Sequence, residues 1–167
     1  MAEYAIGPRG TTTPFMPTVV ALVGGTVKTV VQVATPATTD IRILGWGVSF
    51  DGASGTAVPV ICQLADGDVA ATVTAFTPEL WGNTQQPASL CVGGTAATGF
   101  NASVEGTMTT IRQVDAEHVH PQAGYGVWYQ EGDKQSRVTV SRFLRIRCLA
   151  PAAVNVIPWI VWQEPAL

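Results

Sequence analysis

Apolar and polar residues alternate along most of the chain, and β-branched residues are frequent within the alternating stretches. A two-residue period puts successive side chains on opposite faces of a strand, and the 3.6-residue period of an amphipathic helix is nearly absent. The clearest expected strand is Ile41–Phe50, in which Trp46 and Val48 share one face and glycines occupy the other. Two glycines opposite a tryptophan, Gly45 and Gly47, indicate that another backbone or sheet approaches closely there.

Similar short segments recur, separated by residues that favour turns. The other expected strands are residues 19–23, 27–33, 58–64, 69–73, 89–92, 107–114, 125–129, 137–149 and 154–163. Gly24 and Gly25 predict a tight hairpin or a bulge, and a polar turn at 131–134 predicts that 125–129 pairs with 137–149. The only helical signal is Thr followed by Pro at the start of 77–81. About eight to ten short strands without alternating helices predict an all-β fold, an antiparallel, jelly-roll-like β-sandwich.

The first seventeen residues differ from the rest because Gly, Pro and Thr dominate them. Proline fixes its own backbone and favours an extended residue before it, so residues 1–17 are expected to form an extended N-terminal arm ahead of a single sandwich domain, 18–167. The arm still carries side chains that a solvated linker would not need, so we expect it to dock along another surface. The expected contact residues are Tyr4, Ile6, Pro8, Arg9, Phe15 and Met16.

The last expected strand is apolar on both faces, which predicts that both faces are covered. Trp159 lies on one face, and Ile160 and Trp162 lie on the other. Tryptophan is a common anchor residue where subunits meet, so these three side chains are candidates for a subunit interface.

Basic residues concentrate between positions 134 and 147. In a chain with few charges they form a candidate interface stripe, in which Arg142, Arg145 and Arg147 would meet carboxylates on a neighbouring strand or subunit. Asp115 and Glu117 are possible partners, and an ordinary solvated sheet face is the alternative.

The composition narrows the possible functions. The chain has 167 residues, the length of a single domain, and only 13% of them are charged, against about 25% in a typical soluble domain. Much of its exterior is therefore expected to be covered by other polypeptides. A pI near 5.2 disfavours nucleic acid as a partner. No signal peptide and no membrane-spanning helix is expected, and the three cysteines are expected to be buried free thiols.

The strongest candidate for chemistry is the pair His118 and His120, which would share one face of a strand. Two imidazoles at this spacing can hold a metal, as in the cupin barrels, but no acid follows at the cupin spacing and the chain has no third histidine. The alternative is that the pair lies at a strand end before Pro121. No nucleophile elbow or phosphate-binding loop is present, so no catalytic residue and no cofactor is expected.

Four stretches, TDIRILGWGVSFDG (39–52), LWG (80–82), ASLCVGG (88–94) and IPWIVWQEP (157–165), are similar to small structural proteins of tailed phages and prophages of actinobacteria. The resemblance implies a virion component on the capsid exterior, and at this size a head decoration, or cement, protein. Such proteins are typically small β-rich trimers on an HK97-type shell, so the implied partners are the major capsid protein and other copies of the chain. The alternatives are a tail, fibre or receptor-binding domain that contacts host-surface sugar or protein, and a cupin-like metalloenzyme.

Overall fold

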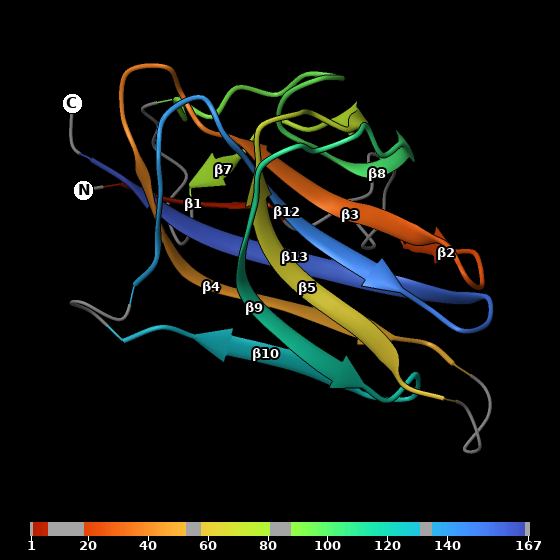
Figure 1. Ribbon diagram of the computed structural model, residues 1–167. Helices are drawn as coiled ribbons and strands as arrows, with labels where there is room; N and C mark the ends of the chain where they lie inside the picture. Colours follow the sequence, from red (N-terminus) through yellow and green to blue (C-terminus); the bar gives the residue numbers. More distant parts are fainter. Residues whose placement is uncertain (1, 7–18, 53–57, 81–87, 131–134, 166–167) are drawn as a thin grey trace, which may run out of the picture.

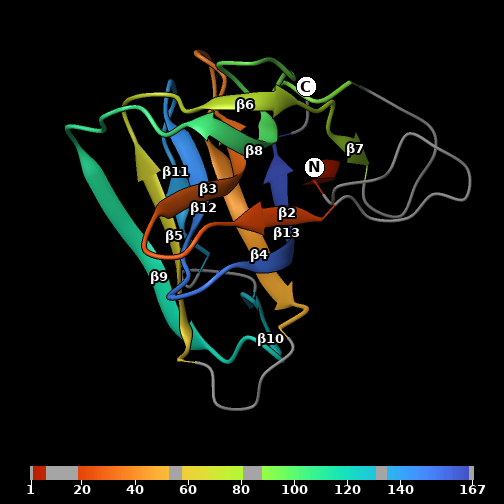
Figure 2. The ribbon, with the colours of Figure 1, turned by 90° about the vertical axis from the view of Figure 1, so that its right-hand side faces the viewer.

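A computed structural model describes residues 2–6, 19–52, 58–80, 88–130 and 135–165. These residues form thirteen strands in two antiparallel sheets, which pack face to face as a β-sandwich. Figure 1 shows one sheet in front of the other, and Figure 2 shows them side by side. None of the described residues belongs to a helix that is long and apolar enough to cross a membrane.

The sheet at the back of Figure 1, called the back sheet, has the order β10-β4-β13-β1-β7, with β11 also on β4 and β2 also on β13. Its strands are β1 (Ala2–Ile6), β2 (Val20–Leu22), β4 (Ile41–Phe50), β7 (Glu79–Leu80), β10 (Gly124–Trp128), β11 (Arg137–Val138) and β13 (Val154–Glu164).

The front sheet has the order β6-β8-β3-β12-β5-β9. Its strands are β3 (Val27–Ala34), β5 (Val60–Gly67), β6 (Thr72–Ala75), β8 (Gly99–Val104), β9 (Ile111–Val119) and β12 (Phe143–Leu149). The core lies between the sheets because each strand turns its alternate apolar side chains inward. Trp46 and Trp162 from the back sheet and Leu64, Leu144 and Ile146 from the front sheet are fully buried there.

The start of the expected arm is a strand of the sandwich. β1 pairs with β13 along its whole length, from Ala2 opposite Glu164 to Ile6 opposite Ile160, and with β7 on its other side. Tyr4 and Ile6 are buried in the core, and the Tyr4 ring stacks on Trp162. The expectation that these two side chains contact a shell is therefore corrected, because their alternation matches the inner face of the chain's own sheet. Pro8, Arg9, Phe15 and Met16 lie outside the described residues.

Two expected connections and one expected helical turn are also corrected. Gly24 and Gly25 do not close a hairpin, because β2 belongs to the back sheet and β3 to the front sheet. Strands β10 and β11 both pair with β4 instead of with each other. The expected helical turn at 77–81 contains strand β7.

Candidate functional site

The outer face of the back sheet carries two large aromatic side chains on a floor of glycines. In the register of β13, β4 and β10, Trp159 is opposite Gly47, which is opposite Gly126. Trp128 at the end of β10 is opposite Gly45. We call these five residues the tryptophan platform.

The glycines are needed because the indoles lie against the backbone. A Cβ atom at Gly47 would be 2.4 Å from Nε1 of Trp159, and one at Gly126 would be 3.1 Å from Cζ2 of the same ring. A Cβ at Gly45 would be 3.0 Å from Cε3 of Trp128. The close approach expected at Gly45 and Gly47 is present, but it is made by indole rings and by backbone carbonyl oxygens of the paired strand β10, not by another sheet.

The two indoles also pack on each other, with ring centroids 5.2 Å apart and planes inclined by 29°. Trp159 is half-buried, whereas Trp128 is 54% exposed although it is one of the largest apolar side chains. A pair of indoles held rigidly at the surface offers a large apolar contact area with little conformational entropy left to lose. Such a site is suited to binding and has no chemistry of its own.

The other two expected interface residues of β13 point inward. Ile160 and Trp162 are fully buried in the core, because they alternate with Trp159 along the strand. The Trp162 Nε1–H donates to Oε1 of the buried Glu164 at 3.0 Å, and that carboxylate also accepts from Ser89 and from the Leu90 backbone. Of the three residues, only Trp159 is therefore placed to meet another molecule.

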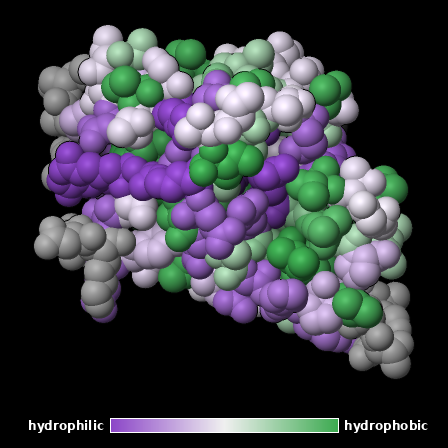
Figure 3. All heavy atoms as spheres, in the orientation of Figure 1, coloured by the Kyte–Doolittle hydropathy of each residue, from purple (hydrophilic) through white to green (hydrophobic). Residues whose placement is uncertain are grey.

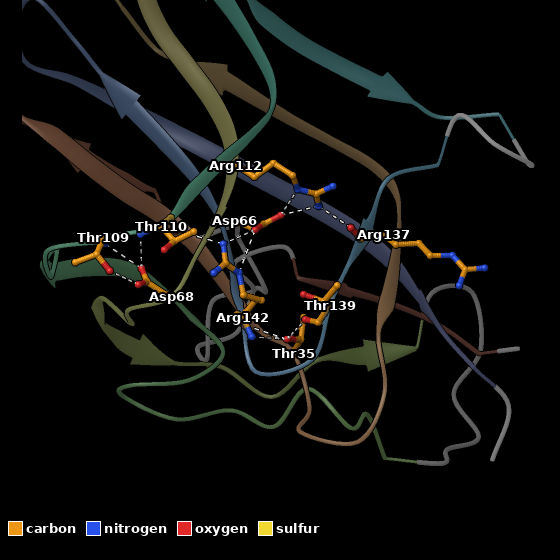
Figure 4. Close-up of polar contacts among 9 residues, drawn as sticks. All are labelled: Thr35, Asp66, Asp68, Thr109, Thr110, Arg112, Arg137, Thr139 and Arg142. Atoms are coloured by element: carbon orange, nitrogen blue, oxygen red, sulfur yellow. Dashed lines mark hydrogen bonds and ion pairs between the residues drawn. The ribbon is translucent and has the colours of Figure 1, made fainter.

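Arg142, Arg145 and Arg147 of the expected basic stripe meet carboxylates of the chain itself. Figure 4 shows Asp66 at the end of β5 between two guanidinium groups. Arg142 donates to Oδ1 of Asp66 through Nε at 3.2 Å and Nη2 at 2.9 Å, and Arg112 donates to Oδ2 through Nε at 2.7 Å. The partner of Arg142 is thus on the neighbouring part of its own sheet and differs from the acids proposed from the sequence.

Arg145 and Arg147 face a second carboxylate, Glu105. The fully buried Arg145 guanidinium donates to the Glu105 carbonyl at 2.9 Å and to the Val69 carbonyl, and its Nη1 is 3.9 Å from the Glu105 carboxylate. Nε of Arg147 is 3.7 Å from the same carboxylate, which also accepts a hydrogen bond from the Thr29 hydroxyl at 2.8 Å. Burial lowers the pKa of Arg145, and Glu105 opposes that shift. These arginines hold loops onto the front sheet.

Asp115, one of the acids expected to meet the arginines, has a different role. Its Oδ2 accepts hydrogen bonds from Nε1 of Trp46 at 3.1 Å and from the hydroxyls of Tyr129 at 3.1 Å and Tyr125 at 3.3 Å. Burial raises the pKa of both tyrosines, and the Asp115 charge raises it further. The carboxylate thus ties β9 of the front sheet to β4 and β10 of the back sheet.

The two histidines lie at the end of β9. His118 is exposed, and Nδ1 of the half-buried His120 accepts a hydrogen bond from the Gln122 backbone at 3.2 Å. Within the described part of the chain, no group of three or more His, Cys, Asp or Glu side chains is arranged to hold a metal ion.

A cavity of about 130 Å³ lies beside β4, β11 and the end of β13. Its lining residues are Asp40, Arg42, Arg137, Gln163, Glu164 and Pro165. Sites for drug-sized ligands occupy roughly 300–1,000 Å³, so this cavity has room only for a very small molecule or ion.

The chain matches no protein-family model, no curated protein and no solved structure with which it was compared.

Sequence reasoning missed Trp128, the more exposed of the two platform tryptophans. Trp128 belongs to a segment expected to be a strand, and Gly45 and Gly47 already indicated a close approach. What the sequence could not supply was the pairing of β10 with β4, which brings Trp128 next to Trp159.

Proposed function

We propose that the protein is a non-enzymatic structural component of a phage particle, which binds the exterior of the assembled head and stabilises it. The tryptophan platform is the observation that carries this proposal, because tryptophan is one of the residue types enriched among those that dominate the energy of protein interfaces. The proposed partner is the major capsid protein of an HK97-type shell, and further copies of the chain, as a trimer, would share the shell surface.

The distribution of hydrophilic side chains supports binding through the back sheet. Figure 3 shows the face of the front sheet, where hydrophilic side chains form a band across the left and centre. The platform on the opposite side of the sandwich consists of indoles and glycines. Docking through the back sheet would bury apolar area without stripping water from ions, which is the costly part of burying a charged face.

Stabilisation by such a protein needs no catalytic step. A protein that binds the assembled shell and not its dissociated subunits stabilises the assembled state by RT ln(1 + [L]/Kd) for each site, where [L] is its free concentration. The proposal therefore requires a strong preference for assembled shells over free subunits.

Co-sedimentation of the purified protein with assembled shells tests the proposal, with dissociated capsid subunits as the comparison. We expect W128A and W159A each to weaken shell binding about 30-fold, the equivalent of a hot-spot loss of about 2 kcal/mol. The control is V104A, which truncates a side chain that is 60% exposed on β8 of the front sheet and is expected to bind normally. Equal binding to shells and free subunits, or normal binding by W128A, would refute the proposal.

The platform also favours a second candidate, a receptor-binding domain that recognises host-surface sugar. The apolar face of a pyranose ring stacks on indole rings held flat at a surface. Binding of immobilised glycans that is lost in W128A, by a protein that does not sediment with shells, would replace the first proposal with this one.

A further inference from the structure

Cys62 and Cys148 face each other in the middle of the front sheet. They are direct partners in the register of β5 and β12, and their Sγ atoms are 3.8 Å apart. Both side chains are fully buried, and all three cysteines of the chain are free thiols, as the sequence predicted.

This arrangement already satisfies the backbone geometry of a disulfide. Directly opposed residues of antiparallel strands have Cα atoms about 4.5–5.5 Å apart, and disulfides join Cα atoms about 4.4–6.8 Å apart. The sulfur atoms must close from 3.8 Å to about 2.0 Å, which rotation of the two side chains can supply while the strands stay paired.

We propose that Cys62 and Cys148 are an oxidation site that forms a cross-strand disulfide when the protein meets a disulfide oxidant. One cysteine thiolate attacks the oxidant's S–S bond, which gives a mixed disulfide and releases one small thiol. The second cysteine then attacks the protein sulfur of the mixed disulfide and releases the other small thiol. The two cysteines lose two protons and two electrons, and the oxidant is reduced to two thiols. This inference does not depend on the proposed function.

The surroundings of the pair make the folded protein react slowly. The hydrogen bond with Cys62, together with burial, raises the pKa of Cys148, so little of the reactive thiolate is present near neutral pH. An oxidant reaches the pair only when the sheet opens locally, for example at β9, which is the edge strand beside β5. Low concentrations of urea should therefore accelerate the reaction.

The bond would fasten two strands that are far apart in the sequence. Cys62 and Cys148 are 86 positions apart, so the link removes much of the conformational freedom of the unfolded chain. For a loop of this length, we expect the melting temperature to rise by about 9–18 °C. The third cysteine, Cys91, is buried in a separate environment beside Ser89 and Glu164 and provides an internal control.

The test is incubation of the full chain with oxidised glutathione, in buffer and in urea below the unfolding transition, followed by intact-mass measurement and peptide mapping. We expect the mass of the chain to fall by that of two hydrogen atoms. Peptide mapping should show a linked Cys62–Cys148 peptide, and one free thiol should remain. The C91A variant should behave in the same way, whereas C62A and C148A should form no intramolecular link. Native tryptophan emission and a higher melting temperature should accompany the link.

The wild-type result decides the question even where an alanine variant fails to fold. Three free thiols after oxidation in both conditions, or a link that involves Cys91, would overturn the proposal. So would a Cys62–Cys148 link that leaves the protein no more stable than its reduced form.

Discussion

Replacing Asp66 by asparagine should produce one of the largest stability losses of any single polar substitution in this chain. The side chain of Asp66 is only 5% exposed and receives charged hydrogen bonds from Arg142 and Arg112 (Figure 4). D66N keeps the shape of the side chain, removes its charge, and turns an NH₂ group toward guanidinium donors. Both guanidinium groups then lose the partner that offsets their removal from water.

The two arginines contribute unequally, because they differ in exposure. Arg142 is 19% exposed and cannot recover much hydration, whereas Arg112 is 49% exposed and can. Removing one member of a buried ion pair costs about 3–5 kcal/mol, and an exposed pair contributes about 0–1 kcal/mol. We therefore expect D66N to lower the free energy of unfolding by about 3–4 kcal/mol, almost entirely through Arg142. A domain with an ordinary stability of about 5–15 kcal/mol would remain folded and measurable.

Urea unfolding followed by tryptophan emission measures this loss, and double-mutant cycles with R142A and R112A divide it. The coupling energy with Asp66 should be about 2 kcal/mol or more for Arg142 and below about 1 kcal/mol for Arg112. The matched control is D40N, because the Asp40–Arg137 pair has a similar distance of 3.2 Å but side chains that are 40% and 57% exposed. A D66N loss no larger than that of D40N, or a stronger coupling to Arg112 than to Arg142, would refute the reasoning from burial.

Two further predictions concern a loop carboxylate and the tryptophan platform. Hydrogen bonds from the Thr109 hydroxyl and the Thr110 backbone lower the pKa of Asp68 from 3.8 to about 2. The stabilising effect of the Asp68 carboxylate is therefore fully present above pH 3.8 and is lost as the pH falls toward 2. The urea midpoint of D68N should therefore drop less on acidification than that of the wild type. Equal drops in the two proteins would contradict this. G47A should cost about 1–3 kcal/mol and shift tryptophan emission, because the new Cβ would lie 2.4 Å from the Trp159 ring and 2.6 Å from the Tyr125 carbonyl oxygen. G94A, whose nearest neighbour is the Ala97 Cβ at 3.2 Å, is the control in thermal unfolding, and an equal loss in both variants would argue against a tightly seated indole.

Strand bounds were predicted best where the apolar residues of a single segment mark the whole strand. Ile41–Phe50 forms β4 with the expected bounds, but a register shift at Leu44 interrupts the alternation, so that Ile43 and Trp46 both lie in the core. β1 was missed as part of the sandwich because its five residues are followed by a Pro-, Gly- and Thr-rich stretch that dominates the composition of the segment. Strand β8 was missed as well, although Phe100, Ala102 and Val104 alternate with polar residues and glycine over 99–104.

The alternation of apolar and polar residues does not predict which distant strands pair. The concentration of arginines was visible in the sequence, but Asp66 and Glu105 lie 76 and 40 positions from the arginines they meet. Which carboxylate each arginine meets depends on the pairing of β12 with β5, and on the loop after β8, which folds back over the sheet. Strand order is set by the packing of the whole domain, so short-range periodicity cannot supply it.

The low charge of the chain and the position of its charges support the proposal that the back sheet is the docking face. Arg142 and Arg145 are used inside the domain, where Asp66 and the Glu105 loop hold them against the front sheet. A partner that covered this region would have to compete with ion pairs that are already formed and would gain little. The centre of the back sheet between β10 and β13 has no ionised group among these described outward residues: Gly45, Gly47, Gly126, Trp128, Ile157 and Trp159. Removing that area from water costs no ionic hydration, so contact there is favoured by the hydrophobic effect alone.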